Sequence, residues 1–383
     1  MEARKKVVII GSAYPLRGGG ISTFNERLAK AFSVRGDEVI IYTFSLQYPS
    51  FLFPGTTQYS TEPPPEGLEI RVRINSINPF NWIKTAFEIA KSNPDLAIFR
   101  FWIPFMAPCL GSIARLIKWK TKRRVKIVAI TDNIIPHERR PGDRLLVKYF
   151  TGSVDAFVAM SESVLRDLSL FDKIKPRAYY PHPLYDNFGA VVSKEIAKQK
   201  LGMDESYGYL LFFGFIRDYK GLDLLLEAMS NPKVSDLKIK LLIAGEYYGN
   251  EDKYSELISK LGIGDKLVLQ TRFIPNSEVY LYFCASDIVV QPYKNATQSG
   301  VTQIAYHFGK PMITTRVGGL SEMVPDGKVG YVVEPEQNDI AEAISKFYIG
   351  NKEEEFIENV KKEKVRFSWD GLLNTIDNLY KLS

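Results

Sequence analysis

The sequence contains few of the residues that build disulfide scaffolds, metal clusters or membrane spans. Only two cysteines occur among 383 residues, Cys109 and Cys284, and each lies in an apolar stretch. Two buried thiols fit a reducing compartment and exclude a disulfide framework or a cysteine-based metal cluster. The most apolar stretch, 96–117, is interrupted by two arginines and two prolines. It falls short of the ~20 apolar residues of a spanning helix, so the protein is not expected to be integral to a membrane.

The sequence also lacks motifs for binding a metal ion or a nucleic acid. No Asp-x-Asp pair is present to hold a cation, and no low-complexity tract or nucleic-acid recognition motif occurs. The apolar run Val7–Ile10 is too short for the core of a signal peptide and fits a first strand instead. Charge is unevenly distributed, because residues 1–186 carry 27 Lys and Arg against 17 Asp and Glu. An anionic partner for the first half is therefore worth considering.

Patterns typical of strands and helices alternate along the whole chain, which predicts an α/β protein with parallel sheets. The expected strands are 7–10, 38–43, 68–73, 96–101, 126–131, 156–160, 209–213, 240–244, 267–270, 288–290, 312–315 and 331–333. A length of 383 residues favours two domains. We expect an N-terminal doubly wound domain over 1–190, joined by a final helix from 367–383, and a C-terminal one over 191–366, with a cleft between them.

The first loop, Gly11–Phe24, contains three consecutive glycines before a helix. Such a loop lets the backbone approach a ligand closely, and the helix offers unpaired N–H groups. A dinucleotide oxidoreductase would need a G-x-G-x-x-G pattern and a carboxylate at the end of the second strand. The spacing here differs, and the second strand ends in Thr43 and Phe44. Hydride transfer is therefore disfavoured, while a loop that binds no ligand stays an alternative.

Two loops of the second half also suit an anion. In LLFFGFIRDYKGLDLLLEA a strand ends at Gly214, and Arg217 and Lys220 follow before a helix. Two cations beside a strand end and a helix N-terminus suit a diphosphate. Alternatively, the two side chains are exposed to solvent on an ordinary turn and bind no ligand. In the segment 291–315, a polar loop precedes a helix near Gly300. Several such loops at the carboxyl ends of strands in one sheet predict a ligand site there.

These motifs, taken in order, resemble the retaining glycosyltransferases of family four, which have the GT-B fold of two facing Rossmann-like domains. The resemblance covers nearly the whole chain. It rests on YPLRGGGIS, GDEVIIYT, FFGFIRDYKGLDLLLEA, LLIAGE, GKPMITTRVGGLSEMV and DGKVGYVVEP, and on the closing FSWDGLLNTIDNLYKL. It implies an enzyme that moves a sugar from a nucleotide-diphosphate donor to an acceptor, with retention at the anomeric carbon.

The resemblance also implies which residues bind the donor. The diphosphate is expected to contact Gly19, Gly20, Gly214, Arg217, Lys220 and the backbone amides of Ser299, Gly300 and Val301. The nucleoside is expected to contact Gly245, Glu246, Phe273, Ile274 and Glu322. Helix N-termini and cationic side chains can stabilise the leaving diphosphate without a metal ion. We therefore expect neither a metal ion nor a cofactor.

The chain departs from the family's pattern at two places. The arginine that usually follows the strand-end glycine is replaced by Phe215, and Arg217 lies two residues later. The family also has two glutamates with seven residues between them, the second of which binds the donor ribose. Aligning GKP places Ala296 and Ile304 at those positions. Another residue must then bind the donor ribose, and Glu322 is a candidate for this role.

The expected catalytic side of the first domain is KIVAITDNIIPHERRPGDR. Similar enzymes place a His or Asp at the end of this strand, near the reacting carbon and the acceptor hydroxyl. Asp132 occupies that place here, and His137 and Glu138 follow in the loop. Asp132 could instead cap a helix, and His137 could be structural. No second carboxylate can be assigned as an enzymic nucleophile, so a front-face mechanism is expected.

A basic segment, LIKWKTKRRVK, follows an apolar stretch. Arg115, Lys118 and Lys122 along one helical side could rest on an anionic bilayer, or could form an ordinary solvated face. We expect a cytoplasmic enzyme, peripheral at the inner face of the membrane if this segment matters, acting on a lipid-linked or saccharide acceptor. The alternatives are another GT-B enzyme, such as an epimerase or a phosphorylase, or a non-catalytic module that binds nucleotide sugars or membranes.

Overall fold

The chain folds into two compact units, each built on its own parallel sheet. A computed structural model describes residues 4–17, 20–49, 57–60, 63–135, 140–296 and 299–383. The first unit comprises Met1–Pro183 and Ser368–Ser383, and the second comprises Leu184–Phe367. The sequence placed the boundary after residue 190, seven residues further along.

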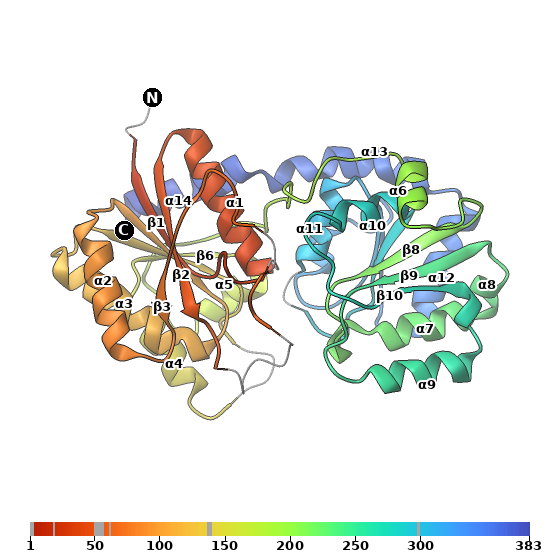
Figure 1. The fold of residues 1–383 in the computed structure, drawn as a ribbon, viewed down its shortest axis with the longest axis horizontal. Coiled ribbons are helices and arrows are strands. Elements are labelled where there is room, and N and C mark those ends of the chain that lie inside the picture. The colour runs from red at the N-terminus through yellow and green to blue at the C-terminus, as the bar shows by residue number, and fades with distance from the viewer. Residues whose placement is uncertain (1–3, 18–19, 50–56, 61–62, 136–139, 297–298) are drawn as a thin grey trace. The chain divides into compact units, whose positions relative to one another are not determined.

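The first unit contains a seven-stranded sheet in the order β3-β2-β1-β4-β5-β6-β7 (Figure 1). Its strands are β1 (Lys6–Ile10), β2 (Glu38–Leu46), β3 (Glu69–Asn75), β4 (Leu96–Phe101), β5 (Lys126–Thr131), β6 (Ala156–Ala159) and β7 (Arg177–Tyr179). All of its neighbouring pairs are parallel. Because β1, β4, β5 and β6 are covered on both faces, they are mostly apolar and do not alternate with polar residues; Arg100 in β4 is the exception that matters for the site.

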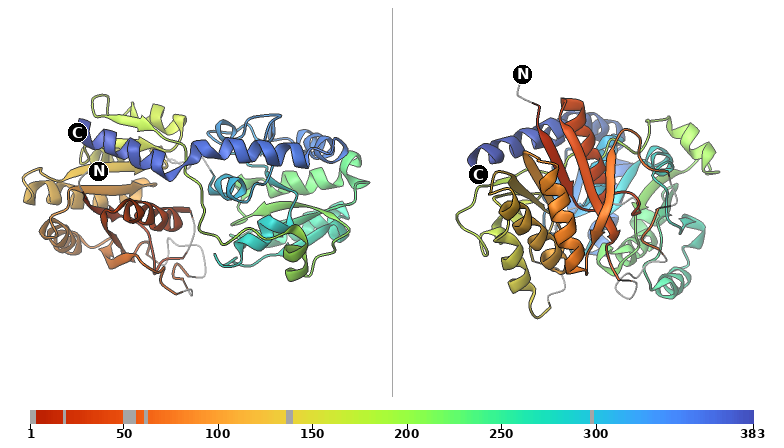
Figure 2. Two further views of the ribbon diagram at one scale, coloured as in Figure 1. Left: turned by 90° about the horizontal axis from the view of Figure 1, so that it is seen from above. Right: turned by 60° about the vertical axis from the view of Figure 1, so that its left-hand side comes forward.

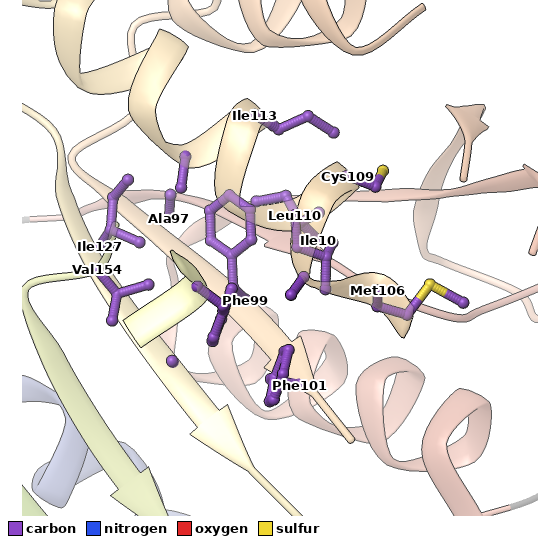
Figure 3. Packing of buried hydrophobic residues seen from close by; sticks show 14 of the residues in the cluster. Ile10, Ala97, Phe99, Phe101, Met106, Cys109, Leu110, Ile113, Ile127 and Val154 are labelled. Atoms are coloured by element: carbon purple, nitrogen blue, oxygen red, sulfur yellow. The ribbon is translucent and has the colours of Figure 1, made fainter. Parts of the chain in front are cut away.

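Helices cover both faces of this sheet. They are α1 (Gly20–Arg35), α2 (Pro79–Lys91), α3 (Ala107–Lys120), α4 (Asp143–Thr151), α5 (Glu162–Leu168) and α14 (Trp369–Leu382), with the 3₁₀ turn η2 (Pro104–Met106) before α3. Figure 3 shows how α3 contributes Cys109, Leu110 and Ile113 to a core that also contains Phe99 and Phe101 of β4. The thiol Cys109 is fully buried there, and burial raises its pKa. This face of the sheet is thus closed by α2, α3 and α4.

The last helix completes the first unit rather than the second. Both views in Figure 2 show α14, in blue, on the unit that contains the N-terminus. Its Asp377 accepts hydrogen bonds from Lys5 Nζ at 2.7 Å and from Arg35 Nη1 at 2.5 Å. At its start, Tyr180 donates a hydrogen bond to the carbonyl of Ser368 at 2.6 Å. Segments from the two ends of the chain therefore form one core.

The second unit repeats the scheme with a six-stranded sheet in the order β10-β9-β8-β11-β12-β13. The strands are β8 (Gly208–Phe213), β9 (Ile239–Ala244), β10 (Leu267–Gln270), β11 (Ile288–Gln291), β12 (Met312–Thr315) and β13 (Gly330–Val333). The helices are α6 (Lys194–Lys200), α7 (Leu222–Ser230), α8 (Pro232–Ser235), α9 (Glu251–Leu261), α10 (Val279–Ala285), α11 (Gly300–His307), α12 (Gln337–Ile349) and α13 (Glu353–Glu363). The 3₁₀ turns are η3 (Asp218–Lys220), η4 (Gly264–Lys266), η5 (Ser321–Met323) and η6 (Lys364–Phe367).

Each strand expected from the sequence is present, within about three residues at its ends. The three-residue edge strand β7 was not expected, because Arg177–Tyr179 is too short and too polar to show a strand pattern. Throughout the described residues, no helix combines the length and apolarity that crossing a bilayer requires.

Candidate functional site

The second unit has its topological switch point between β8 and β11, which pair with each other although β9 and β10 come between them in the chain. At such a point the loops from neighbouring strands diverge to opposite faces, and the crevice between them is where open α/β sheets bind ligands. The loop after β8 contains Gly214, Arg217 and Lys220, and the loop after β11 leads to α11. The fold therefore brings the two anion-suited loops of the sequence to one place.

Backbone contacts confirm that these two loops lie against each other. The N–H of Lys294 donates to the carbonyl of Tyr219 at 2.7 Å. Gly221 has a φ of 67° and lies so close to the other loop that a Cβ there would come within 1.9 Å of the carbonyl oxygen of Pro292. Only glycine fits this position, for both its backbone conformation and its contact.

Lys220 is a buried cation at the centre of this site. Its residue is 8% exposed, and a Cβ built on Gly214 would lie 2.9 Å from the Lys220 ammonium. Among the described residues, that ammonium has no hydrogen-bonded acceptor and no carboxylate partner. Burial, together with the charge of Arg217, lowers the pKa of Lys220 to about 7. Its Nζ lies 5.7 Å from the centroid of the Tyr293 ring. A buried ammonium without a carboxylate partner is costly for a folded protein to keep.

Arg217 lies on the same loop but is held differently. Its guanidinium stacks on the ring of Tyr248, with Cζ 3.8 Å from the ring centroid. The Nε of Arg217 is buried and makes no hydrogen bond with any described residue. Arg217 thus adds positive charge beside Lys220 and has a hydrogen-bond donor to spare.

The N-terminus of α11 lies at the end of the second loop. Ser299 caps it, and its Oγ accepts from the N–H of Val301 at 3.3 Å and lies 3.3 Å from the hydroxyl of Tyr293. The backbone amide of Val301, which the sequence assigned to the diphosphate, is therefore already bonded within the cap. A ligand would have to replace this long hydrogen bond, while the positive end of the helix still faces it.

The expected nucleoside-binding residues follow the neighbouring strands. Gly245 comes directly after β9, and a Cβ there would lie 2.1 Å from the carbonyl oxygen of Gly214, so the two strand ends are in contact. Glu246 follows it and is half-buried. Phe273 and Ile274 come after β10, and Glu322 lies in η5 after β12. Since the strands are parallel, all five residues lie at the same edge of the sheet as Lys220.

The positions that correspond to the family's two glutamates hold buried apolar residues. Ala296 is 4% exposed and packs with Tyr293 and Leu320, and Ile304 is 5% exposed. Neighbouring polar side chains are buried as well, since Thr302 donates to Gln291 Oε1 at 3.1 Å. Within the described part of the chain, Gln303 is fully buried and neither of its amide atoms has a partner. This edge of the site is thus built from uncharged side chains.

The first unit has its own switch point between β1 and β4. The loop after β1 is fixed by α1, because Asn25 Nδ2 donates to the carbonyl of Ser12 at 2.9 Å and Glu26 Oε1 accepts from the N–H of Tyr14 at 2.8 Å. Gly20 begins α1 and is exposed. Gly19, assigned to the diphosphate beside it, lies outside the described residues.

Asp132 follows β5 and is bound by a residue that the sequence did not single out. Arg100, on the adjacent strand β4, donates from Nε to Asp132 Oδ2 at 2.6 Å and from Nη2 to Asp132 Oδ1. Arg100 is 2% exposed, and its Cζ lies 3.7 Å from the ring centroid of Phe24. Asp132 is therefore a fixed carboxylate in an ion pair rather than a helix cap. His137 and Glu138, the other expected catalytic residues, lie outside the described residues.

His182 was undecided from the sequence and is a buried neighbour of this ion pair. Its ring packs edge-on against Phe24, with centroids 4.9 Å apart, and its Nδ1 lies 2.8 Å from the carbonyl oxygen of Pro183. Burial and the charge of Arg100 lower the pKa of His182 to about 3. The imidazole is therefore neutral at physiological pH and acts here as a packing element.

Two of the three cations expected at a membrane have partners inside the protein. Arg115 donates to the carbonyls of Gly111 at 3.0 Å and Tyr149 at 2.5 Å, and stacks on the Tyr149 ring. Lys118 forms an ion pair with Asp155 at 2.5 Å. Lys122 is exposed. Arg115, Lys118 and Lys122 therefore do not form a free cationic stripe. Among the described residues, no three His, Cys, Asp or Glu gather in a way that could hold a metal ion.

Comparisons with known proteins agree with this architecture. One family model, described as Glycosyltransferase Family 4, matches residues 18–179, and a second, described as Glycosyl transferases group 1, matches 193–363. A D-inositol 3-phosphate glycosyltransferase from Thermobifida fusca is 26% identical over 82% of this chain and 77% of its own length. The two models account for both units in the expected order.

Solved structures show the same fold over the whole chain. The Anabaena protein HepE, solved in complex with UDP, matches with a TM-score of 0.73 and 15% identity over 97% of this chain and 98% of its own. The catalytic domain of starch synthase IV from Arabidopsis thaliana, bound to ADP and acarbose, matches with a TM-score of 0.73 and 15% identity over 99% of both chains. The chain therefore belongs to the glycosyltransferases of family four and has the GT-B fold.

Proposed function

We propose that this glycosyltransferase takes its sugar from a nucleotide-diphosphate donor bound at the carboxyl edge of the second unit's sheet. Cleaving the bond to the donor leaves a diphosphate, so the enzyme has to stabilise negative charge on the leaving group. The observation that carries the proposal is the ammonium of Lys220, which is buried at the switch point. Among the described residues its Nζ lies 5.7 Å from the centroid of the Tyr293 ring and has no carboxylate partner. Arg217 and the N-terminus of α11 supply further positive potential beside it.

Each element of the site has a role in this proposal. Lys220 and Arg217 bind the diphosphate, with Gly214, Ser299, Gly300 and Val301 around it. Gly245, Glu246, Phe273, Ile274 and Glu322 contact the nucleoside. UDP in HepE and ADP in starch synthase IV, two proteins of the same fold, support a nucleotide diphosphate as the ligand. Fixed cations make a metal ion unnecessary, and retention is proposed from the family resemblance.

On the acceptor side we assign Asp132, with His137 and Glu138 after it, to the reacting centre. The Arg100 side chain holds the Asp132 carboxylate in one orientation, which suits electrostatic stabilisation of a developing positive charge on the sugar. The proposed acceptor is a lipid-linked sugar or a saccharide precursor. The proposed setting is the cytoplasm, at the inner face of the cell membrane.

The test begins with binding, because the donor base is unknown. A thermal-shift screen against UDP, GDP, ADP and their sugars should identify one nucleotide that stabilises the protein by mass action. Lys220→Ala should abolish this stabilisation and lower transfer by about 100-fold, as expected for loss of one preorganised charge. Lys233→Ala removes an exposed lysine of α8 that pairs with Glu342, and should change neither.

Product analysis separates the remaining possibilities. Transfer of the donor sugar to an added acceptor supports the proposal, whereas an epimerised nucleotide sugar or a sugar phosphate would identify a different GT-B chemistry. Nucleotide binding without turnover would favour a non-catalytic module. A wild-type response of Lys220→Ala to every nucleotide would remove the diphosphate assignment.

A further inference from the structure

The helix α2 is apolar on two opposite faces, although the core uses only one of them. Its inner face buries Ala86 and Ile89 in the core of the first unit. Its outer face carries Phe80, which is 84% exposed, and Ile83, which is 43% exposed. An ordinary surface helix has a polar outer face, because exposed apolar side chains gain nothing from folding. The outer face of α2 therefore requires another explanation.

Helix α3 extends this apolar surface. Its last turn carries Trp119, which is 69% exposed and stacks on Phe87 of α2 with ring centroids 6.1 Å apart. The two helices pack side by side on the same face of the sheet, as Figure 1 shows. Just before α2, Ile77 is also 51% exposed. These side chains, Ile77, Phe80, Ile83, Phe87 and Trp119, are called the α2/α3 strip below.

Cations surround the strip. Lys84 and Lys91 are exposed on the same side of α2 as Phe80 and Phe87, because they follow at helical spacing. Lys120 lies over the Phe87 ring, with Nζ 5.3 Å from its centroid. The turn after α3 adds Lys122, Arg123 and Arg124, all of them exposed. Arg124 donates to the side chain of Asn93, which places this turn beside the end of α2.

Acidic residues do not offset this charge. Helix α3 and the turn 121–124 contain none, and α2 contains one, Glu88. Glu88 is engaged by β3, since Arg73 Nε lies 3.2 Å from its Oε2. Exposed aromatic rings with lysines and arginines around them suit the interfacial layer of a bilayer, where rings enter the acyl boundary and cations meet lipid phosphates.

We propose that the α2/α3 strip is a docking surface for an anionic membrane. This places the membrane contact on Phe80, Ile83 and Trp119 with Lys84, Lys91 and Lys120, and not on Arg115 and Lys118, which are bonded within the protein. It deepens the proposed function by naming the surface that would bring the enzyme to a lipid-linked acceptor. It does not depend on that function, because binding to vesicles is measured without any transfer.

The test is cosedimentation of the full chain with vesicles of phosphatidylcholine alone and of phosphatidylcholine mixed equally with phosphatidylglycerol. The parent protein should bind the mixed vesicles only, and more weakly as salt rises. Phe80→Ser with Trp119→Ser should weaken binding by about tenfold or more, because two large apolar side chains no longer enter the bilayer. Lys84→Glu with Lys91→Glu and Lys120→Glu should remove the preference for the anionic lipid.

The matched control is Val34→Ser with Ile349→Ser. These residues are 76% and 68% exposed and lie on α1 and α12, which are not part of the strip. The control should bind vesicles as the parent does. Equal losses in the control and strip variants, or no binding by the parent, would overturn the proposal. So would a dimer in sedimentation that the strip variants dissociate, since a second copy would then cover the strip.

A thermal-shift titration with the preferred nucleotide should give the same response in all of these variants. This readout separates the two proposals. If the strip variants lose vesicle binding but keep the thermal shift with nucleotide, the result bears on the membrane proposal and leaves the donor site unaffected. If the parent protein shows no thermal shift with any nucleotide, the donor-site proposal fails and the membrane proposal is unaffected.

Discussion

Arg100 and Asp132 form a two-bonded ion pair inside the first unit, with Arg100 Nε 2.6 Å from Asp132 Oδ2. The two residues lie at the ends of adjacent strands, and Arg100 also covers the ring of Phe24. Its third nitrogen, Nη1, is buried and has no partner among the described residues. A buried charge that is only partly satisfied is expensive to keep for stability alone. The pair therefore fits a functional carboxylate with a dedicated positioning residue.

Removing Arg100 should destabilise the protein strongly, because the buried Asp132 carboxylate would lose the guanidinium that neutralises it. Arg100→Met is expected to lower the free energy of unfolding by about 3–5 kcal/mol, measured by urea denaturation. Adding Asp132→Asn should recover part of this loss. The control, Arg73→Met, removes an exposed partner of Glu88 and should cost at most about 1 kcal/mol. Additive effects of Arg100→Met and Asp132→Asn would show that the two side chains do not interact.

Replacing Gly221 should separate steric contact from backbone strain. Gly221→Ala is expected to cost more than about 3 kcal/mol, since its Cβ would collide with Pro292 as well as adopt a positive φ. Gly262 has a similar φ of 64°, but no atom lies within 4 Å of the position of its Cβ. Gly262→Ala should therefore cost only about 1–2 kcal/mol. If Gly221→Ala and Gly262→Ala lowered thermal stability equally, the loops after β8 and β11 would not approach each other as closely as described.

Nucleotide binding should depend on pH through Lys220. The free protein holds the pKa of this ammonium at about 7, and a bound diphosphate raises it, so binding takes up a proton above pH 7. The dissociation constant should then rise by up to about tenfold per pH unit from pH 7 upward. Calorimetry in buffers of different ionisation enthalpy measures this proton uptake directly. Lys220→Met should bind weakly at every pH and show no uptake.

Lys220→Met should also be more stable than the parent protein without ligand. The pKa of Lys220 is lower in the folded state than in the unfolded state, so the unfolded chain binds more protons between pH 7 and about 10.5. The stability of the parent should therefore rise with pH across this window, and that of Lys220→Met should not. A stabilising substitution that removes binding is expected where function requires an unfavourable buried charge.

Acid should destabilise the first unit through His182. The pKa of its imidazole is lowered to about 3 by burial and by Arg100, whereas in the unfolded chain it is near 6.5. Between these values the unfolded state binds the extra proton, so stability falls as the pH is lowered, by up to about 1.4 kcal/mol per pH unit. His182→Phe should reduce this acid dependence in chemical denaturation. An unchanged pH profile would contradict a buried, neutral His182.

Much of the fold could be predicted from the sequence, because both sheets are parallel and covered on both faces. Their central strands are therefore mostly apolar runs, and the helices between them show clear periodicity. The donor loops could be located for a related reason, since strand ends, glycines and cations such as Lys220 follow one another closely in the chain. Strand β7 could not be predicted, because an edge strand of three residues, Arg177–Tyr179, is too short to show a pattern.

Side-chain pairing was much less predictable than the order of the elements. Arg115 and Lys118 looked like a free basic face, because their partners, Tyr149 and Asp155, are far away in sequence. Arg100 interrupts an apolar strand, which is a usable signal, since a charge inside a covered strand must have a partner. The identity of that partner, Asp132, required the register between β4 and β5. The Ser299 cap on Val301 could have been inferred from the sequence, because a helix was expected near Gly300 and serine is a favoured N-cap residue.

The return of α14 to the first unit determines the order in which the protein can fold during synthesis. Leu372, Leu373 and Ile376 of α14 cover part of the first unit's sheet, so strands β5 to β7 of that unit lack this cover until α14 has left the ribosome. The second unit ends at Phe367 and can be complete earlier. A nascent chain stalled soon after Phe367 should therefore resist protease in its later half while its earlier half is still digested. The first unit, although most of it is translated first, is therefore the last to complete its fold.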